Sequence, residues 1–153
     1  MKINAGRLLN WTLREIGTED SQALVDLYFE RDSLRLMAAV TAKGRYEIKG
    51  GVFRHGELLA CTAAAPQEKA AGEISYRQLL GSLVYDEEGD VLGAIGDVRL
   101  DIDNLRASDV DLSGGVLADL AFGRKRVSVE HLKDMLVELE GEELFIVRIA
   151  TVR

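Results

Sequence analysis

The chain has 153 residues, of which 47% are hydrophobic and 29% charged, the balance of a folded globular protein rather than a disordered one. Nineteen Lys and Arg against 26 Asp and Glu leave a net charge of −7, which disfavours direct nucleic-acid binding because acidic surfaces are repelled by phosphates. No apolar run reaches the roughly 18 residues that a membrane span needs. The N-terminus also lacks an apolar signal segment, so we expect a cytoplasmic protein.

Short strands separated by turns run through most of the chain. Polar and apolar residues alternate, or β-branched residues dominate, in Tyr46–Lys49, Val98–Ile102, Val127–Val129, Val137–Glu140 and Leu144–Val152. Glycine-containing turns are expected at residues 49–51, 87–90, 113–115 and 140–142. Short helical segments are expected at Arg7–Leu9, at Arg77–Leu80 and at Val129–Met135, the last with Ser128 as its N-cap. The pattern predicts an all-β chain with short helical turns.

The only proline divides the chain into parts of similar length. Pro66 lies in a segment of small residues that is typical of a linker. We therefore expect one domain at residues 1–65, a linker at 66–73 and a second domain at 74–153.

The two parts resemble each other when Ile3 is aligned with Ile74 and no gap is introduced, which we call the repeat alignment. Seven of 32 aligned positions are then identical between residues 3–34 and 74–105. A diverged tandem duplication explains this agreement; the alternative is that two β-rich segments share their alternation by chance. The identical pairs are Ile3/Ile74, Leu8/Leu79, Leu9/Leu80, Ala23/Ala94, Asp26/Asp97, Asp32/Asp103 and Leu34/Leu105.

The second part resembles the PRC-barrel domain, a small β-barrel family. The resemblance rests on residues 76–101, where a Leu-Leu-Gly turn precedes a strand-turn-strand hairpin, a Leu-Gly step and an aspartate, and on residues 114–117 and 127–132. Val129 departs from it, because many members have tryptophan there. The resemblance covers about residues 74–150 and implies two tandem small PRC-barrel-like β-barrels. Residues 1–65 are then a degenerate copy, with Asn10 in place of Gly81.

The chain offers little catalytic chemistry. His55 is expected in an exposed turn, and the pair Ser128 and His131 is better explained as a helix cap than as a nucleophile and its base. Two histidines and one cysteine give no zinc spacing, and Cys61 is expected to be a buried small residue. We predict no catalytic residues, no metal and no cofactor.

Charged and aromatic residues suggest contact surfaces instead. Five aspartates at positions 97, 101, 103, 109 and 111 fail the EF-hand spacing and are better explained as a solvated strand face than as a weak calcium site. The only dense basic run, Arg124, Lys125 and Arg126, is expected in a solvated loop; the alternative is that it binds a phosphate or an acidic partner strand. Trp11 is expected either to anchor an interface or to pack in the core.

The resemblance implies a non-enzymatic protein-interaction or assembly module. Its contact surface would be exposed strand edges and the run Arg124–Arg126, its partner a protein, and homo-oligomerisation a secondary expectation. The alternative that the family implies is a factor like the ribosome maturation factor, contacting a ribosomal protein or RNA.

Overall fold

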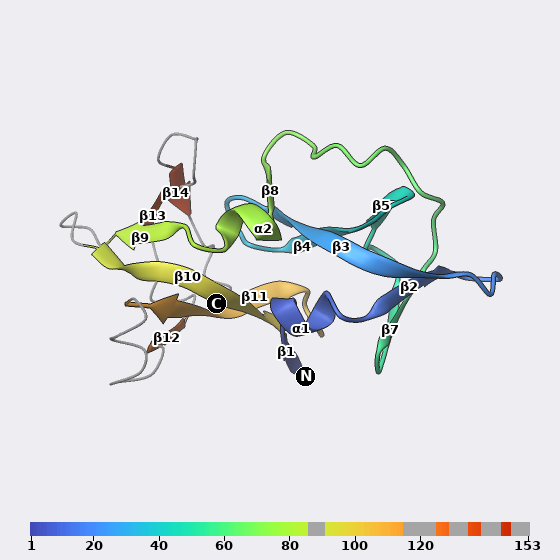
Figure 1. Cartoon of the computed structure of the whole chain (residues 1–153), viewed down its shortest axis with the longest axis horizontal. Coiled ribbons are helices and arrows are strands. Elements are labelled where there is room, and N and C mark those ends of the chain that lie inside the picture. The colour runs from blue at the N-terminus through green and yellow to red at the C-terminus, as the bar shows by residue number, and fades with distance from the viewer. Residues whose placement is uncertain (86–90, 115–124, 129–134, 139–144, 148–153) are drawn as a thin grey trace.

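The fold is described from a computed structural model of the chain, which describes residues 1–85, 91–114, 125–128, 135–138 and 145–147. Within these residues the chain forms two seven-stranded β-sheets and two four-residue helices. The two sheets lie side by side along the long axis of the molecule, and both helices lie where the sheets meet (Figure 1). The predicted fold class, all-β with short helical turns and two tandem β-domains, is confirmed.

The first sheet comes almost entirely from the first half of the chain. Its hydrogen-bonded order is β5-β4-β3-β2-β7-β6, and β8 pairs with β3 outside this path. Neighbouring strands are antiparallel except β2 and β7, which run parallel. The strands are β2 (Thr12–Glu15), β3 (Ser21–Glu30), β4 (Leu36–Thr41), β5 (Gly44–Glu47), β6 (Val52–Arg54), β7 (Glu57–Ala60) and β8 (Glu73–Ser75).

The second sheet comes almost entirely from the second half. Its order is β12-β11-β10-β9-β13-β14, β1 pairs with β10, and all of these pairs are antiparallel. The strands are β1 (Lys2–Asn4), β9 (Leu83–Tyr85), β10 (Val91–Asp101), β11 (Arg106–Ser113), β12 (Lys125–Ser128), β13 (Met135–Glu138) and β14 (Phe145–Val147). The predicted strands at 46–49, 98–102, 127–129, 137–140 and 144–152 are each found over at least part of their length.

In each half, one short helix follows the first strand, as the sequence predicts. The two helices are α1 (Ala5–Leu8) and α2 (Tyr76–Leu79), and each begins slightly earlier than expected. Ser75 begins α2 with a capping box, in which its side chain accepts from backbone N–H groups while Gln78 bonds back to the Ser75 N–H. The third predicted helix, at 129–135, lies outside the described residues except for Met135, which begins β13.

The first strand of each half pairs with the sheet of the other half. In β1, Ile3 lies opposite Leu100 of β10, and in β8, Ile74 lies opposite Phe29 of β3. All four side chains are buried. The two halves therefore exchange strands across the interface between them, which we call the join, rather than forming independent sheets. Figure 1 shows β1 and α1 beside β10 and β11.

One hydrophobic core cluster runs through both halves. It includes fully buried residues of the first sheet, such as Leu13 and Leu27, and of the second, such as Val98 and Leu100. Burying one such leucine or valine stabilises the fold by about 2 kcal/mol relative to its exposure. Because the cluster is continuous, neither half is packed independently of the other.

Residues 61–72 connect the halves as an exposed segment that is anchored to the first sheet. Ala65 exchanges two backbone hydrogen bonds with Arg45 of β5, of 2.8 and 2.9 Å. The Tyr28 hydroxyl donates to the Gln67 carbonyl, and the Gln67 side chain donates to the Thr41 carbonyl. The segment overlaps the expected linker, whose last residue, Glu73, begins β8.

Candidate interaction surface

Trp11 lies in the core. Its residue is 8% exposed, and its ring packs 6.5 Å from the Phe53 ring and 6.4 Å from the His55 ring, measured between centroids. Of the two alternatives given by the sequence, core packing is the one the structure shows. His55 lies in an exposed turn between β6 and β7, as predicted.

The basic run is not a loop where the structure describes it. Lys125 and Arg126 lie in β12, where Arg126 is opposite Asp111 and Lys125 opposite Leu112 of β11. The Arg126 Nε donates to the Asp111 carboxylate at 3.1 Å, which partly neutralises the run. The loop prediction is wrong for these two residues, because pairing with an acidic neighbouring strand favours extended backbone; Arg124 lies outside the described residues. Trp11 packs on Phe53 and His55 in the first half, whereas Arg126 binds Asp111 in the second, so among the described residues the structure does not bring these two together.

Three of the five aspartates on β10, β11 and the turn between them form ion pairs, and Asp103, in the turn, is also exposed. Asp103 accepts from the N-terminal ammonium at 3.0 Å, Asp109 lies 3.9 Å from the Lys2 ammonium, and Asp111 binds Arg126. In the part of the chain that the structure describes, no three acidic, histidine or cysteine side chains gather as a metal site would require.

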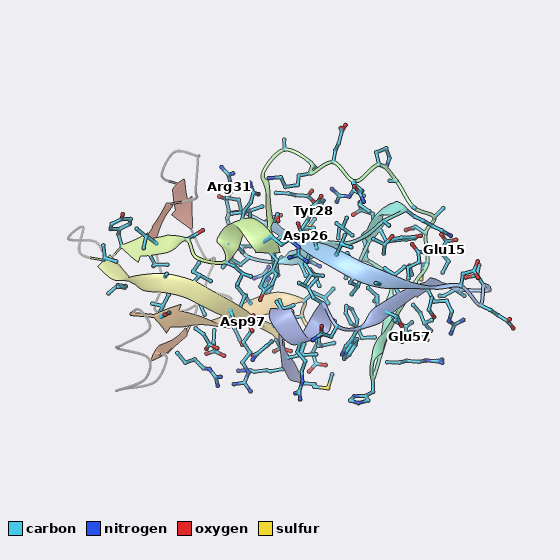
Figure 2. All side chains as sticks on the ribbon, viewed as in Figure 1. Glu15, Asp26, Tyr28, Arg31, Glu57 and Asp97 are labelled. Atoms are coloured by element: carbon cyan, nitrogen blue, oxygen red, sulfur yellow. The ribbon has the colours of Figure 1, made fainter. Side chains whose placement is uncertain are left out.

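Asp97 has a role that the sequence did not reveal. Its carboxylate accepts from the Gly6 N–H of α1 at 3.1 Å and from the Tyr76 hydroxyl at 2.7 Å, so it contacts both halves of the chain. Asp26, its counterpart in the repeat, accepts from the Arg77 N–H of α2 and from the Ser75 hydroxyl. Figure 2 shows both aspartates near the join. Their identity in the repeat alignment was the available signal.

Cys61 is exposed, so its predicted burial is wrong. It follows directly on β7, whose last three residues are buried, and the chain leaves the sheet there. The apolar neighbours in the sequence belong to that strand and do not extend to the thiol.

The main buried charge pair is structural. Arg45 holds Glu73 with two guanidinium–carboxylate hydrogen bonds of 2.5 and 2.9 Å, and both side chains are buried. Burial alone would raise the pKa of Glu73, but hydrogen bonds from Arg45 and from the Ala70 N–H outweigh it and lower that pKa below its usual range. The hydrogen bonds between Arg45 and Glu73 also raise the pKa of Arg45. The pair fixes the start of β8 against β5.

An apolar sheet face lies on the outside of β9 and β10, and we call it the β9–β10 face. Leu83 and Val91 are 37% and 56% exposed, and they line an open depression of about 330 Å³ together with Leu92 and Ala94. Val84, which points to the opposite face, is buried. The signal in the sequence was that Leu83, Val84 and Tyr85 do not alternate with polar residues. A strand with one face in solvent usually alternates, so an apolar residue is exposed here.

The equivalent face of the first half is polar. The repeat alignment places Thr12 and Arg14 where Leu83 and Tyr85 stand. Arg14 forms a two-bond ion pair with Glu57 of β7, at 3.0 and 3.3 Å. The hydrogen bonds raise the pKa of Arg14 and lower the pKa of Glu57. The two halves thus share the arrangement of their first four strands and helix and differ in the chemistry of this face.

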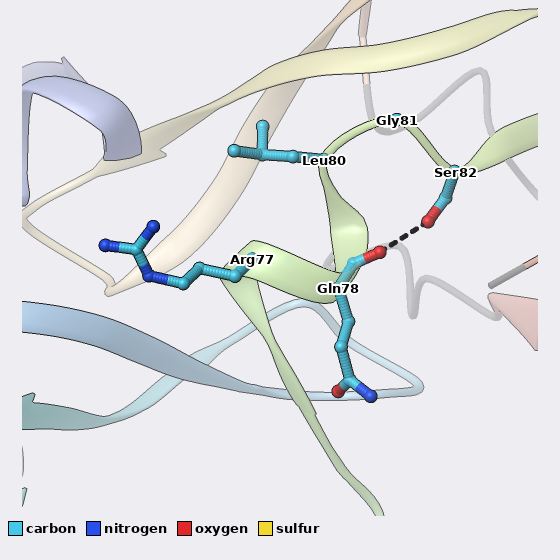
Figure 3. Close-up of a pocket in the computed structure, with 5 residues that line it drawn as sticks. All are labelled: Arg77, Gln78, Leu80, Gly81 and Ser82. Carbon is cyan, nitrogen blue, oxygen red and sulfur yellow. Dashed lines mark hydrogen bonds between the residues drawn. The ribbon is translucent and has the colours of Figure 1, made fainter. Parts of the chain in front are cut away.

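A second depression of about 320 Å³ adjoins the turn after α2. Arg77, Gln78, Leu80, Gly81 and Ser82 line it (Figure 3). The Ser82 hydroxyl donates to the Gln78 carbonyl at 2.6 Å, and the Arg77 Nε donates to the Val25 carbonyl at 2.6 Å. Because these polar groups already have partners, the exposed Leu80 side chain is the main group this depression offers to a contact.

The comparisons with known proteins identify the family. The PRC-barrel domain family matches residues 71–150, more than half of the chain. The chain therefore belongs to the PRC-barrel family, and the resemblance found for residues 74–150 is confirmed. No family matches the first half, and the sequence matches none of the curated proteins with which it was compared. No helix among the described residues is long and apolar enough to cross a membrane.

Proposed function

We propose that this chain is a non-enzymatic protein-interaction or assembly module, and that its partner docks on the β9–β10 face. One observation carries the proposal: Leu83 and Val91 are exposed on the outer face of one half, where the other half has polar side chains and an ion pair. Exposed apolar side chains gathered on one face of a soluble protein mark contact sites for other proteins. The strands on which these side chains lie correspond in the two halves, so we attribute the difference to function rather than to the needs of the fold.

The acidic charge of the sequence selects the kind of partner. The five residues between β9 and β10 in the sequence are Asp86, Glu87, Glu88, Gly89 and Asp90, so four carboxyl groups belong to the segment that joins the two strands. The whole chain carries a net charge of −7. A protein whose contact surface has an apolar centre and a basic rim complements both features. Nucleic acid has neither.

The first half, in this proposal, is a degenerate second copy of the PRC-barrel domain. In the repeat alignment its strands β1, β2, β3 and β4 and its helix α1 correspond to β8, β9, β10, β11 and α2, with ends that agree within one residue. It adds buried surface to a domain whose own core would be small. In this proposal the first copy stabilises the second by packing against it, while the second copy provides the contact face.

A capture experiment with matched variants tests the docking face. The tagged full chain is incubated with native lysate, with and without nuclease, beside a double variant Leu83→Thr/Val91→Thr. The control double variant is Ile16→Thr/Val52→Thr, which removes apolar side chains that are 55% and 43% exposed on the first half. Threonine keeps strand propensity at Leu83, Val91 and Val52, and Ile16 lies in an exposed turn after β2. Both variants should therefore fold with stabilities close to that of the parent chain.

The proposal predicts that one protein is captured by the parent and the control but lost with Leu83→Thr/Val91→Thr, and that nuclease leaves capture unchanged. Capture that is equal in both variants contradicts the docking face. Release by nuclease contradicts the protein partner and favours the RNA contact of a ribosome-maturation-like factor. Recovery of the tagged chain alone, with no self-association at micromolar concentration, contradicts the interaction role.

A further inference from the structure

The contacts between the two halves occur in pairs with the roles exchanged. The Ile102 N–H donates to the Met1 carbonyl at 2.9 Å, and between the counterparts of these two residues the Arg31 N–H donates to the Gly72 carbonyl at 2.8 Å. The strand pairings repeat in the same way: Lys2, Ile3 and Asn4 lie opposite Asp101, Leu100 and Arg99, and Glu73, Ile74 and Ser75 lie opposite Glu30, Phe29 and Tyr28.

The two equivalent aspartates follow the same rule. The Gly6 N–H at the start of α1 donates to Asp97 Oδ1 at 3.1 Å, and the Arg77 N–H at the start of α2 donates to Asp26 Oδ1 at 3.3 Å. Gly6 corresponds to Arg77 and Asp97 to Asp26 in the repeat alignment. Each half therefore holds the first helix of the other half with the same carboxylate.

At the centre of the join, residues meet their own counterparts. Arg35 forms an isolated antiparallel bridge with Arg106, its equivalent in the repeat alignment. The Leu36 N–H donates to the Leu105 carbonyl at 2.7 Å, and the Ala107 N–H donates to the Leu34 carbonyl at 3.0 Å. Leu34 and Leu105 both have the left-handed backbone that leucine rarely adopts, with φ of 53° and 60°. A repeat stacked by translation pairs equivalent residues in parallel, as in a β-solenoid. The antiparallel pairing of Arg35 with its own equivalent requires a two-fold axis instead.

Reciprocal contacts of this kind define the interface of a two-fold homodimer, in which residue i of one copy contacts j of the other and j contacts i. We infer that the join is a homodimer interface closed within one chain, and that the partner it fits is another copy of the same repeat. Segment 61–72 then acts as a tether, which raises the effective concentration of one half near the other. The inference rests on the two copies proposed above but not on the docking face.

This inference predicts that the halves remain together when the tether is cut. A protease site inserted after Ala63, in the exposed part of the connecting segment, permits cleavage of the folded full chain. After cleavage we expect the two fragments to elute as one species in gel filtration and to give a one-to-one complex by native mass spectrometry. Fragments that separate without denaturant overturn the inference.

Variants of the two aspartates test the two-fold relation itself. Asp97→Asn weakens one hydrogen bond from the other half, and Asp26→Asn weakens two, because Asp26 also accepts from the Ser75 hydroxyl. Each should therefore raise the dissociation constant of the cleaved complex by at least about tenfold, the usual effect of one hydrogen bond to a charged group. Asp111→Asn is the matched control, since its ion pair with Arg126 lies within one half, and it should leave the constant unchanged.

Fold is checked on the uncut variants by circular dichroism before cleavage. A loss confined to one of the two aspartates, or an equal loss with Asp111→Asn, overturns the two-fold interface. Capture of an outside protein by the uncut chain is a separate measurement, so failure of the docking face and failure of this inference are distinguishable.

Discussion

Arg45 and Glu73 join the first sheet to the strand that the second half contributes to it. The guanidinium of Arg45, on β5, donates to both carboxylate oxygens of Glu73 at the start of β8, and its Nε donates to Glu47 at 2.9 Å. Arg45 also pairs through its backbone with Ala65 of the connecting segment. One residue thus anchors the connection and the exchanged strand.

Glu73→Gln should destabilise the chain by about 3 kcal/mol at pH 7, because it leaves a buried guanidinium without its countercharge. The folded-state pKa of Glu73 is lowered, so its contribution is present above the usual glutamate pKa of 4.5 and is lost as the pH falls through the lowered value. The difference between parent and variant should therefore disappear in strong acid. Urea unfolding at a series of pH values measures it.

Glu47→Gln serves as the control for this pair. Glu47 binds the same guanidinium, but its side chain is 49% exposed, so its loss should cost no more than about 1 kcal/mol. Two outcomes would contradict this prediction: an equal loss of unfolding free energy in the two variants, or a Glu73→Gln effect that does not change with pH. Either would show that the burial of the Arg45–Glu73 ion pair does not determine its contribution to stability.

Gly44 is expected to tolerate no side chain. A Cβ there would lie 2.0 Å from the Ala65 carbonyl oxygen, and its φ of +149° already favours glycine. Gly44→Ala should cost about 3 kcal/mol or more, from backbone strain and the clash together. Gly17→Ala, at φ +89° with no atom within 4 Å, carries only the strain and should cost about 1 kcal/mol. Thermal unfolding distinguishes the two; similar losses would contradict close packing of the connecting segment on β5.

Local features of the fold could be predicted from the sequence. The helical turns at Arg7 and Arg77, the strand over Val98–Ile102 and the internal repeat all depend on neighbouring residues or on a constant shift. These patterns are visible without knowing which distant segments meet. They were sufficient for the fold class and for the family of the second half.

Features that depend on long-range pairing could not be predicted. Nothing near Ile3 shows that its strand joins β10 rather than its own sheet, and nothing near Asp97 shows that it holds α1. The basic run was assigned to a loop because the opposing Asp111 is distant in sequence. The β9–β10 face was missed because a short strand with an exposed apolar face has the same continuous apolar sequence as a strand that is buried on both faces.

The exposure of Cys61 leads to a simple chemical prediction. Because the chain has one cysteine and it is exposed, a thiol-specific aromatic disulfide reagent should titrate one thiol per native chain without denaturant. Cys61→Ser should abolish the reaction and change the free energy of unfolding by no more than about 0.5 kcal/mol. A thiol that reacts only after unfolding would show that Cys61 is buried, as its apolar neighbours in the sequence first suggested.

The continuous core predicts that both halves unfold together. Trp11, the only tryptophan, is buried in the first half, so its fluorescence reports on that half, while far-UV circular dichroism reports on both. The two signals should give one urea midpoint, because residues of both halves belong to a single core cluster and the halves exchange strands. A second chain with Trp11→Phe and Tyr85→Trp moves the probe to β9 and should give the midpoint seen by its own circular dichroism. Separate midpoints for the two probe positions would mean that the shared core does not couple the halves.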